Sequence, residues 1–225
     1  MLFPSMKEKL PNLKSSLIKL DFEQAVIGAL ENYFPEAKIY GCNFHFNQCI
    51  WKDVQNIGLV SEHTDNEEIR LDIRMCAALA YLPIEDIDDG WLCIQETSPI
   101  SEKMEQFYDY FVKQWLQNTH ITKEMWNCHD QRHRSNNVLE GCNHRLKTLI
   151  RPHPNIFQLV KCLIKEAEYC DHLYDRLTFN LEGKRCKKTY INLNERISKT
   201  LQKYKDTRDL RLCLTTLAYI QKLHK

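Results

Sequence analysis

The stretch Leu20–Trp51, "LDFEQAVIGALENYFPEAKIYGCNFHFNQCIW", decides the fold of the N-terminal part of this chain. Its apolar residues first repeat at helical spacing and then, after Pro35, enter a short apolar run that is typical of a strand. An alternation of strand, helix, strand and helix predicts an α/β unit. We expect strands at 15–20 and 37–42, and helices at 22–34 and 46–59.

The rest of the chain changes character from about Asn66. The remaining long segments have helical periodicity, with no convincing strand between them. In one of them a single apolar stripe contains Ile156, Leu159, Val160, Leu163, Ile164, Ala167, Cys170, Leu173, Tyr174 and Leu177. The sequence thus predicts a small α/β fragment followed by a mainly helical remainder, with helices in 66–82, 100–117, 155–179 and 206–223.

Composition fits an ordinary globular protein of 225 residues with a formal net charge of +1. The N-terminus lacks the features of a secretory signal, and no apolar run is long enough to span a bilayer, so we expect no membrane partner. The ten cysteines are scattered through helical patterns, which favours reduced thiols inside a cell. Five of them, on apolar helical faces, are expected in the core: Cys49, Cys76, Cys162, Cys170 and Cys213.

Charge is distributed unevenly along the chain. Residues 62–105 contain twelve acidic and three basic residues, whereas 184–225 contain twelve basic and three acidic ones. A basic end of this kind can approach phosphates. The alternative is that these runs are only the solvated faces of helices.

Two carboxylates stand out by their positions. Asp21 lies where the first predicted strand ends, a usual place for functional side chains in α/β sheets. Glu140 lies near the start of a predicted helix among several arginines and lysines. Acids that hold Mg²⁺ beside basic residues that grip DNA would suit metal-assisted phosphoryl chemistry. Each acid also has a structural interpretation, in which Asp21 with Gln24, and Asn137 with Glu140, form capping boxes.

The arrangement as a whole resembles the Mutator-like (MULE) transposases and their domesticated descendants. The matching features are D-F-E-x-A after a strand, F-P, a C-x-F-H-x-x-Q corner, an S-N-N-x-x-E-G block, and H-P-N before a long helix. The resemblance covers roughly 17–168. It implies an α/β fold with a partial RNase H-like core, a large helical insertion and a helical C-terminal region. We also expect a nuclear location, DNA as the partner, and homo-oligomers. The corresponding segments are 1–60 (partial core), 61–127 (insertion), 128–182 (return to the core with the third acid) and 183–225 (basic helical tail).

Carried over by position, Asp21 matches the second catalytic acid of that family and Glu140 the third, both as Mg²⁺ ligands. Ser135 replaces the usual threonine. The first acid has no counterpart, since only twenty residues precede Asp21 and their single acid, Glu8, lies outside any strand pattern. We therefore expect Mg²⁺-dependent strand cleavage and transfer as the inherited chemistry, but an inactive chain; the alternative is a domesticated module that binds DNA or a protein. The expected DNA contacts are Arg132, Arg134, Asn136, Asn137, Arg145, Lys147, Arg151, Lys184, Arg185, Lys187 and Lys188.

The corner "GCNFH" also raises the question of zinc. Cys42 and His45 match the C-x-x-H pair of the family, and half of a tetrahedral zinc set has this spacing. The other half would come from the segment Cys128–His133, with Cys128 and His133 as the expected ligands and His129 as a further choice. The alternative is that Cys42 is a buried cysteine and that His45 hydrogen-bonds locally.

Overall fold

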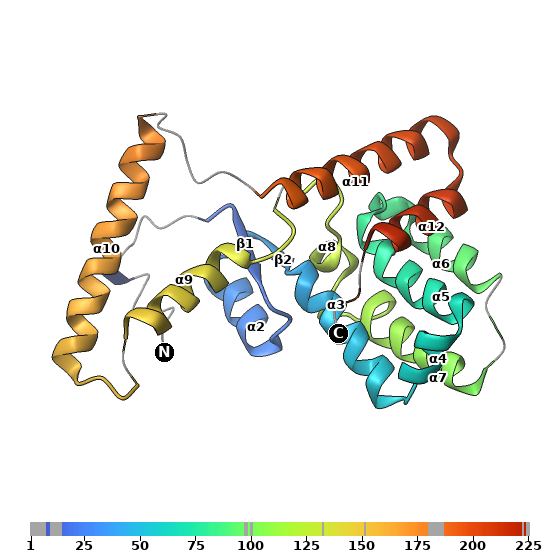
Figure 1. The fold of residues 1–225 in the computed structure, drawn as a ribbon, viewed down its shortest axis with the longest axis horizontal. Helices are drawn as coiled ribbons and strands as arrows, with labels where there is room; N and C mark the ends of the chain where they lie inside the picture. Colours follow the sequence, from blue (N-terminus) through green and yellow to red (C-terminus); the bar gives the residue numbers. More distant parts are fainter. Residues whose placement is uncertain are drawn as a thin grey trace. The chain divides into compact units, whose positions relative to one another are not determined.

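The computed structural model describes residues 8–9, 15–96, 99, 101–131, 133–150, 152–179, 187–221 and 223. The chain forms two compact units. The first unit contains residues 1–135 and 195–225, and the second contains residues 136–194. Figure 1 shows the helices and strands of both.

The first unit opens with the predicted strand–helix–strand element. Strands β1 (Leu17–Leu20) and β2 (Lys38–Gly41) pair in parallel, with Leu17 opposite Lys38 and Leu20 opposite Gly41. Helix α2 (Gln24–Tyr33) connects them and ends just before Pro35. The local prediction from the apolar spacing is therefore confirmed for these elements.

The prediction of an RNase H-like core is wrong. Such a core needs a multistranded sheet, whereas the described residues form one sheet of two strands and are otherwise mainly helical. The physical reason lies in the pattern of the sequence: after β2 the apolar residues recur at helical spacing, so none of the later segments that the structure describes supplies a strand to extend the sheet. Of the expected fold class, the mainly helical remainder agrees with the structure.

Helices make up the rest of the first unit (Figure 1). The C-terminal helix returns to pack against α5 and α6 and buries Leu214 and Leu217 completely or nearly so. The helices are α3 (Asn43–Asn56), α4 (Val60–Asp65), α5 (Glu67–Ala78), α6 (Ile87–Gln95), α7 (Glu102–Phe111), α8 (Lys123–Trp126), α11 (Lys188–Thr207, in this unit from Glu195) and α12 (Leu210–Ile220), with 3₁₀ turns at Leu79–Tyr81 and Ile84–Asp86 and a π-helical turn at Val112–Leu116.

An aromatic cluster joins the sheet end to this helical core. The ring of Phe46, on α3, stacks on Trp126 at 5.2 Å and meets Trp115 edge-on at 4.6 Å. Trp126 donates its indole N–H to the carbonyl of Trp115 at 2.9 Å. All three side chains are buried. The cluster therefore fixes the start of α3, which follows β2 directly.

The second unit contains α9 (Asn137–Leu149) and α10 (Ile156–Thr178). Asn155 caps α10 in a full capping box with Gln158. The two helices meet through the guanidinium of Arg145, which pairs with the Glu166 carboxylate and lies 3.6 Å from the centre of the Tyr169 ring. None of the residues of α10 is buried.

Candidate metal centre at the ends of the two strands

The carboxyl ends of β1 and β2 bring three predicted residues together. Asp21 follows β1, Cys42 follows β2, and His45 lies in the first turn of α3. The amide of Cys42 donates to the carbonyl of Leu20 at 2.9 Å, which extends the pairing to the end of the sheet. Side chains at the carboxyl ends of adjacent parallel strands face the same edge, which is the usual place for a binding site in such sheets.

Gly41 sets the path of the chain at this edge. The Phe22 ring lies so close to Gly41 that an added Cβ would meet its ring atoms at 2.1 and 2.3 Å. Phe22 in turn packs edge-on against Trp115, with ring centres 5.0 Å apart. Only glycine permits this approach, so the residue before Cys42 is fixed by packing between the two strand ends.

The three side chains form a compact set of metal ligand types. Their ligand atoms, a carboxylate oxygen, a thiol sulfur and an imidazole nitrogen, all lie within 4.8 Å of one another. The His45 Nδ1 is 2.8 Å from the Asp21 Oδ1. Ligands on a tetrahedral Zn²⁺ lie roughly 3.3–3.7 Å apart at the usual bond lengths. To hold the ion, the longest separation would have to shorten by about 1 Å and the His45–Asp21 pair would have to move apart by about 0.5 Å, which would leave a fourth position for water.

The three side chains of the cluster differ in their exposure to solvent. The side chain of Cys42 is fully buried, that of His45 is 23% exposed, and that of Asp21 is 53% exposed. A thiol beside an imidazole that pairs with a carboxylate also has the order of a nucleophilic triad. Because Cys42 has no exposed surface, it offers no route for a substrate to reach the sulfur. The arrangement therefore suits a metal ion bound by the buried Cys42 sulfur better than it suits a cysteine nucleophile.

The second half of the predicted zinc set lies apart from this cluster. Among the described residues, the one group with metal-binding geometry consists of Asp21, Cys42 and His45, without Cys128 or His133. Cys128 is buried, and burial raises the pKa of its thiol to about 12, although Arg134 and Lys19 act in the opposite direction. Asp21, which was predicted to bind Mg²⁺, is therefore the third member of the group with Cys42 and His45, where Cys128 and His133 were expected.

Lys19 stands between the two predicted halves. Its ammonium donates to the Gln131 side-chain oxygen at 2.7 Å and to the carbonyl of His133. Burial lowers the pKa of this ammonium, while the thiols of Cys128 and Cys42 raise it. A cation that already interacts with both thiols opposes a second cation between them, which is a physical reason for the absence of Cys128 from the ligand group.

Both helices begin at other residues than the capping interpretations named. Helix α2 begins after Glu23, whose side chain makes no capping hydrogen bond, and Asp21 instead pairs with His45. Helix α9 begins after Asn136, again without a side-chain cap. Glu140 is exposed in the first turn of α9 and belongs to the second unit, so its pairing with Asp21 stays a prediction.

The residues predicted to contact DNA differ in their exposure and in their contacts with other side chains. Arg145 is engaged with Glu166 and Tyr169, and Arg134 lies 5.4 Å from the centre of the Tyr81 ring. Asn137 donates to the Tyr190 hydroxyl at 3.4 Å, and Asn136 is half-buried. Asn137, Lys147, Lys187 and Lys188 are exposed. Outside the described residues lie Arg132, Arg151, Lys184 and Arg185.

A row of basic side chains that the sequence analysis did not single out lies on α11. Arg196, Lys199 and Lys203 are exposed and spaced by three and four residues, so they share one face of the helix. Ile197 and Tyr204 are buried on a neighbouring face. The signal was present in this spacing, but a count of charges over the whole tail concealed it. We call Arg196, Lys199 and Lys203 the basic ridge.

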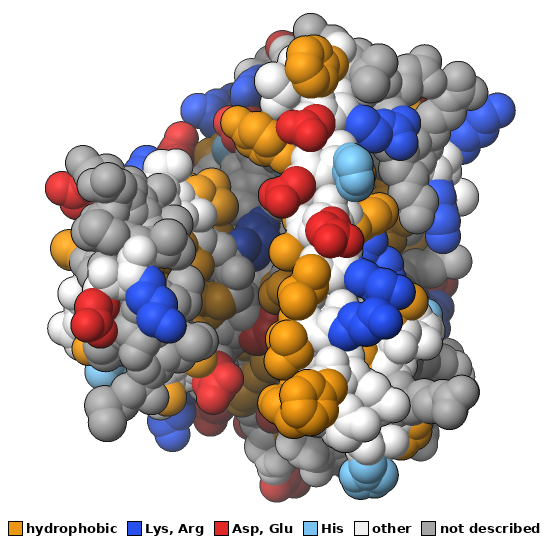
Figure 2. Space-filling model, turned by 90° about the vertical axis from the view of Figure 1, so that its left-hand side faces the viewer, with side chains coloured by type: hydrophobic (Ala, Val, Ile, Leu, Met, Phe, Trp, Pro, Cys, Tyr) orange, Lys and Arg blue, Asp and Glu red, His pale blue; other side chains and the backbone are white. Residues whose placement is uncertain are grey.

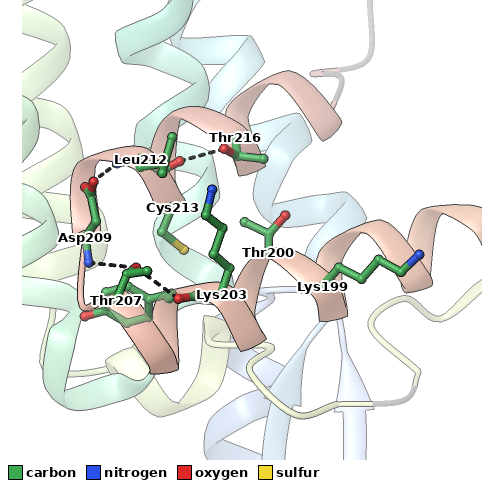
Figure 3. Close-up of a pocket in the computed structure, with 9 residues that line it drawn as sticks. Lys199, Thr200, Lys203, Thr207, Asp209, Leu212, Cys213 and Thr216 are labelled. Carbon is green, nitrogen blue, oxygen red and sulfur yellow. Dashed lines mark hydrogen bonds between the residues drawn. The ribbon is translucent and has the colours of Figure 1, made fainter.

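The basic ridge borders a pocket of about 200 Å³ at the corner between α11 and α12 (Figure 3). Lys203 extends between the two helices, whereas Lys199 points away from α12. Thr207 donates to the carbonyl of Lys203 and accepts from the amide of Asp209, which closes the corner. The pocket is also lined by Thr200 and Thr216.

Comparisons of the chain with protein-family models, with curated proteins and with solved structures found no match. The resemblance to Mutator-like transposases therefore stays a prediction. In the part of the chain that the structure describes, no helix is both long and apolar enough to cross a bilayer.

Proposed function

We propose that this chain is a non-catalytic DNA-binding module of Mutator-like transposase descent, and that the basic ridge contacts the phosphate backbone. The observation that carries the proposal is the alignment of Arg196, Lys199 and Lys203 on one exposed face of α11. The ridge extends over eight residues, or about 10 Å from Arg196 to Lys203 at the rise of an α-helix. This length corresponds to roughly three phosphates of one strand at about 3.4 Å of axial rise each.

The ligand set at the strand ends supports a non-catalytic function. Two-metal phosphoryl transfer relies on carboxylates and other oxygen ligands, which Mg²⁺ prefers. The cluster contains one carboxylate, Asp21, with a buried thiol and an imidazole. This combination suits Zn²⁺ rather than Mg²⁺. We infer that Asp21, Cys42 and His45 would hold Zn²⁺, which would tie the two strand ends to α3.

The test is a titration of a mixed-sequence DNA duplex with the full chain at several salt concentrations, followed by fluorescence anisotropy. We expect binding that weakens steeply with salt. Loss of three phosphate contacts reduces the salt slope by about 2.7 per bound chain, at about 0.9 per contact. The variant R196Q/K199Q/K203Q should show this reduction.

A matched control removes the same charge elsewhere in the first unit. Lys38, Lys52 and Lys113 are exposed and lie on other elements. The variant K38Q/K52Q/K113Q should keep the slope of the wild type. Absence of binding at low salt, or an equal reduction in both variants, would contradict the proposal. Mg²⁺-dependent cleavage of the duplex that is lost in Asp21→Asn would favour the competing view of an active transposase.

A further inference from the structure

Helix α10 is unusual in its exposure. It has 23 residues and a complete capping box, yet it buries none of its side chains. Large apolar residues along it are widely exposed, with Phe157 at 82%, Tyr174 at 71% and Ile156 at 64%. Helices of globular proteins gain most of their stability from packing an apolar face. In Figure 2, apolar side chains run along the whole length of this helix.

Part of this face has the spacing of a coiled coil. Seven residues alternate by steps of four and three over three heptads, and all seven are exposed: Ile156, Val160, Leu163, Ala167, Cys170, Tyr174 and Leu177. A strict 4-3 repeat is typical of helices that pack along one another. We call these seven residues the seam.

Helix α9 leaves the seam uncovered. The contacts that join α9 to α10 run from Cys142 and Arg145 to Glu166 and Tyr169, which are not seam residues. On the other flank, Phe157 and Ile164 are also exposed and widen the apolar face. The α9–α10 contact therefore leaves the seam free of contact with α9.

The charges along α10 are separated by position. Residues 156–165 contain two lysines, Lys161 and Lys165, and no acid, whereas residues 166–178 contain four acids and one arginine. Figure 2 shows the same separation, with acidic side chains toward one end of the helix and basic ones below them. A second helix of the same sequence complements this pattern only when it runs in the opposite direction.

We propose that the seam of α10 binds the seam of a second copy of this chain, in antiparallel orientation. The pairing that sets Ile156 against Tyr174, Val160 against Cys170 and Leu163 against Ala167 forms six layers around a twofold axis. Each layer sets a larger side chain against a smaller one, which fills an interface evenly. Lys161 then lies level with the acidic stretch Glu168–Asp171 of the other copy.

The area of the face is sufficient for a stable dimer. Eight large side chains on it, exposed between 39% and 82%, are Ile156, Phe157, Val160, Leu163, Ile164, Leu173, Tyr174 and Leu177. At roughly 150–200 Å² each when fully accessible, they offer roughly 800 Å². This value equals the area of about 800 Å² that each partner buries in a standard specific interface.

The first experiment measures the mass of the full chain by sedimentation velocity and light scattering at micromolar concentrations. We expect twice the chain mass of 26.8 kDa. The variant L163E/Y174E places two carboxylates in the apolar seam and should raise the dimer dissociation constant by about 100-fold or more. The control Q158E/H172E adds the same charge to exposed positions outside the seam, keeps the capping box, and should remain dimeric. A monomeric wild type, including one in which α10 is covered by its own chain, would overturn the proposal.

The second experiment determines orientation. In Val160→Cys, antiparallel pairing sets the new thiol opposite Cys170 of the other copy. Within one helix these positions are about 15 Å apart, too far for a disulfide. Oxidation of mixed isotope-labelled and unlabelled chains, followed by peptide mapping, should yield 160–170 disulfides between copies. Disulfides that join 160 to 160 and 170 to 170 would show parallel pairing and overturn the orientation.

Discussion

Replacing Gly41 by alanine tests the packing that positions the strand ends. The new Cβ would lie 2.1 Å from the Phe22 ring, whereas ordinary contact begins at about 3.4 Å. The ring would have to move by about 1.3 Å or more, but it packs against Trp115, which is buried in the aromatic cluster. Forced overpacking of this kind costs about 1–3 kcal/mol. For a chain of this size the midpoint of thermal unfolding should fall by roughly 2–4 °C for each kcal/mol.

The control is Gly28→Ala on α2, where an added Cβ meets nothing within 4 Å. Alanine in a helix interior is favoured over glycine by about 0.5–1 kcal/mol, so this variant should be slightly more stable than the wild type. Urea unfolding followed by tryptophan fluorescence measures both. Combining Gly41→Ala with Phe22→Ala removes the clash, so the double variant should be no less stable than Phe22→Ala alone. If Gly41→Ala unfolds like the wild type, the close approach of the ring does not constrain the strand ends.

Two further predictions concern titration and metal binding. Burial raises the pKa of Asp53 to about 6 from 3.8, so the contribution of this carboxyl to stability is present below about pH 4 and is lost as the pH rises through 6. Asp53→Asn should therefore stabilise the chain more at pH 8 than at pH 4, as measured by thermal unfolding. An equal effect at both pH values would contradict this cause. Zn²⁺ should raise the unfolding temperature of the wild type but not of His45→Ala or Cys42→Ser, and competition with a chromogenic chelator should give one ion per chain. If Cys128→Ser shows the same shift in unfolding temperature as the wild type, Cys128 is not a ligand. If that shift is lost in Cys128→Ser, the predicted zinc set is favoured.

The local structure was largely predictable from spacing. The runs around β1, α2, β2 and α3 have apolar periods that match their conformations, and Pro35 marks the end of α2. The caps were less predictable. Asn66, Asn155 and Asp209 cap their helices with side-chain oxygens, whereas α2 begins after Glu23 rather than after Asp21. A polar residue before a helix can serve either as a cap or as a partner for a side chain from elsewhere, and local sequence does not distinguish the two.

The fold class was not predictable from the same signals. A strand–helix–strand unit at the start of a chain is common to many sheets, and its sequence does not state how many strands follow. The two strands here are bounded by helices that pack on an aromatic core around Phe46, Trp115 and Trp126. That core depends on contacts between residues far apart in the chain, which periodicity does not specify. The resemblance supplied a multistranded sheet that the described residues do not form.

The candidate site combined residues that the sequence analysis had assigned to two ions. Asp21 was expected to hold Mg²⁺ with Glu140, and Cys42 and His45 to hold Zn²⁺ with Cys128 and His133. Parallel pairing of β1 with β2 places the residues after the two strands side by side, so Asp21 joins Cys42 and His45. The register of the sheet, Leu20 opposite Gly41, is the information that residue types alone lacked.

The apolar stripe on α10 illustrates the same limit in the opposite direction. Its spacing predicted a long amphipathic helix correctly, and it placed Cys170 on an apolar face. Helical apolar faces are usually read as core, yet Cys170 is exposed, while Cys76 and Cys213, on similar faces of α5 and α12, are buried. The difference is that α5 and α12 pack against each other, whereas α9 contacts α10 beside the seam rather than on it. Periodicity identifies the apolar face of a helix whose burial is favourable. The arrangement of the other elements determines whether that face is buried by the same chain or by a second copy.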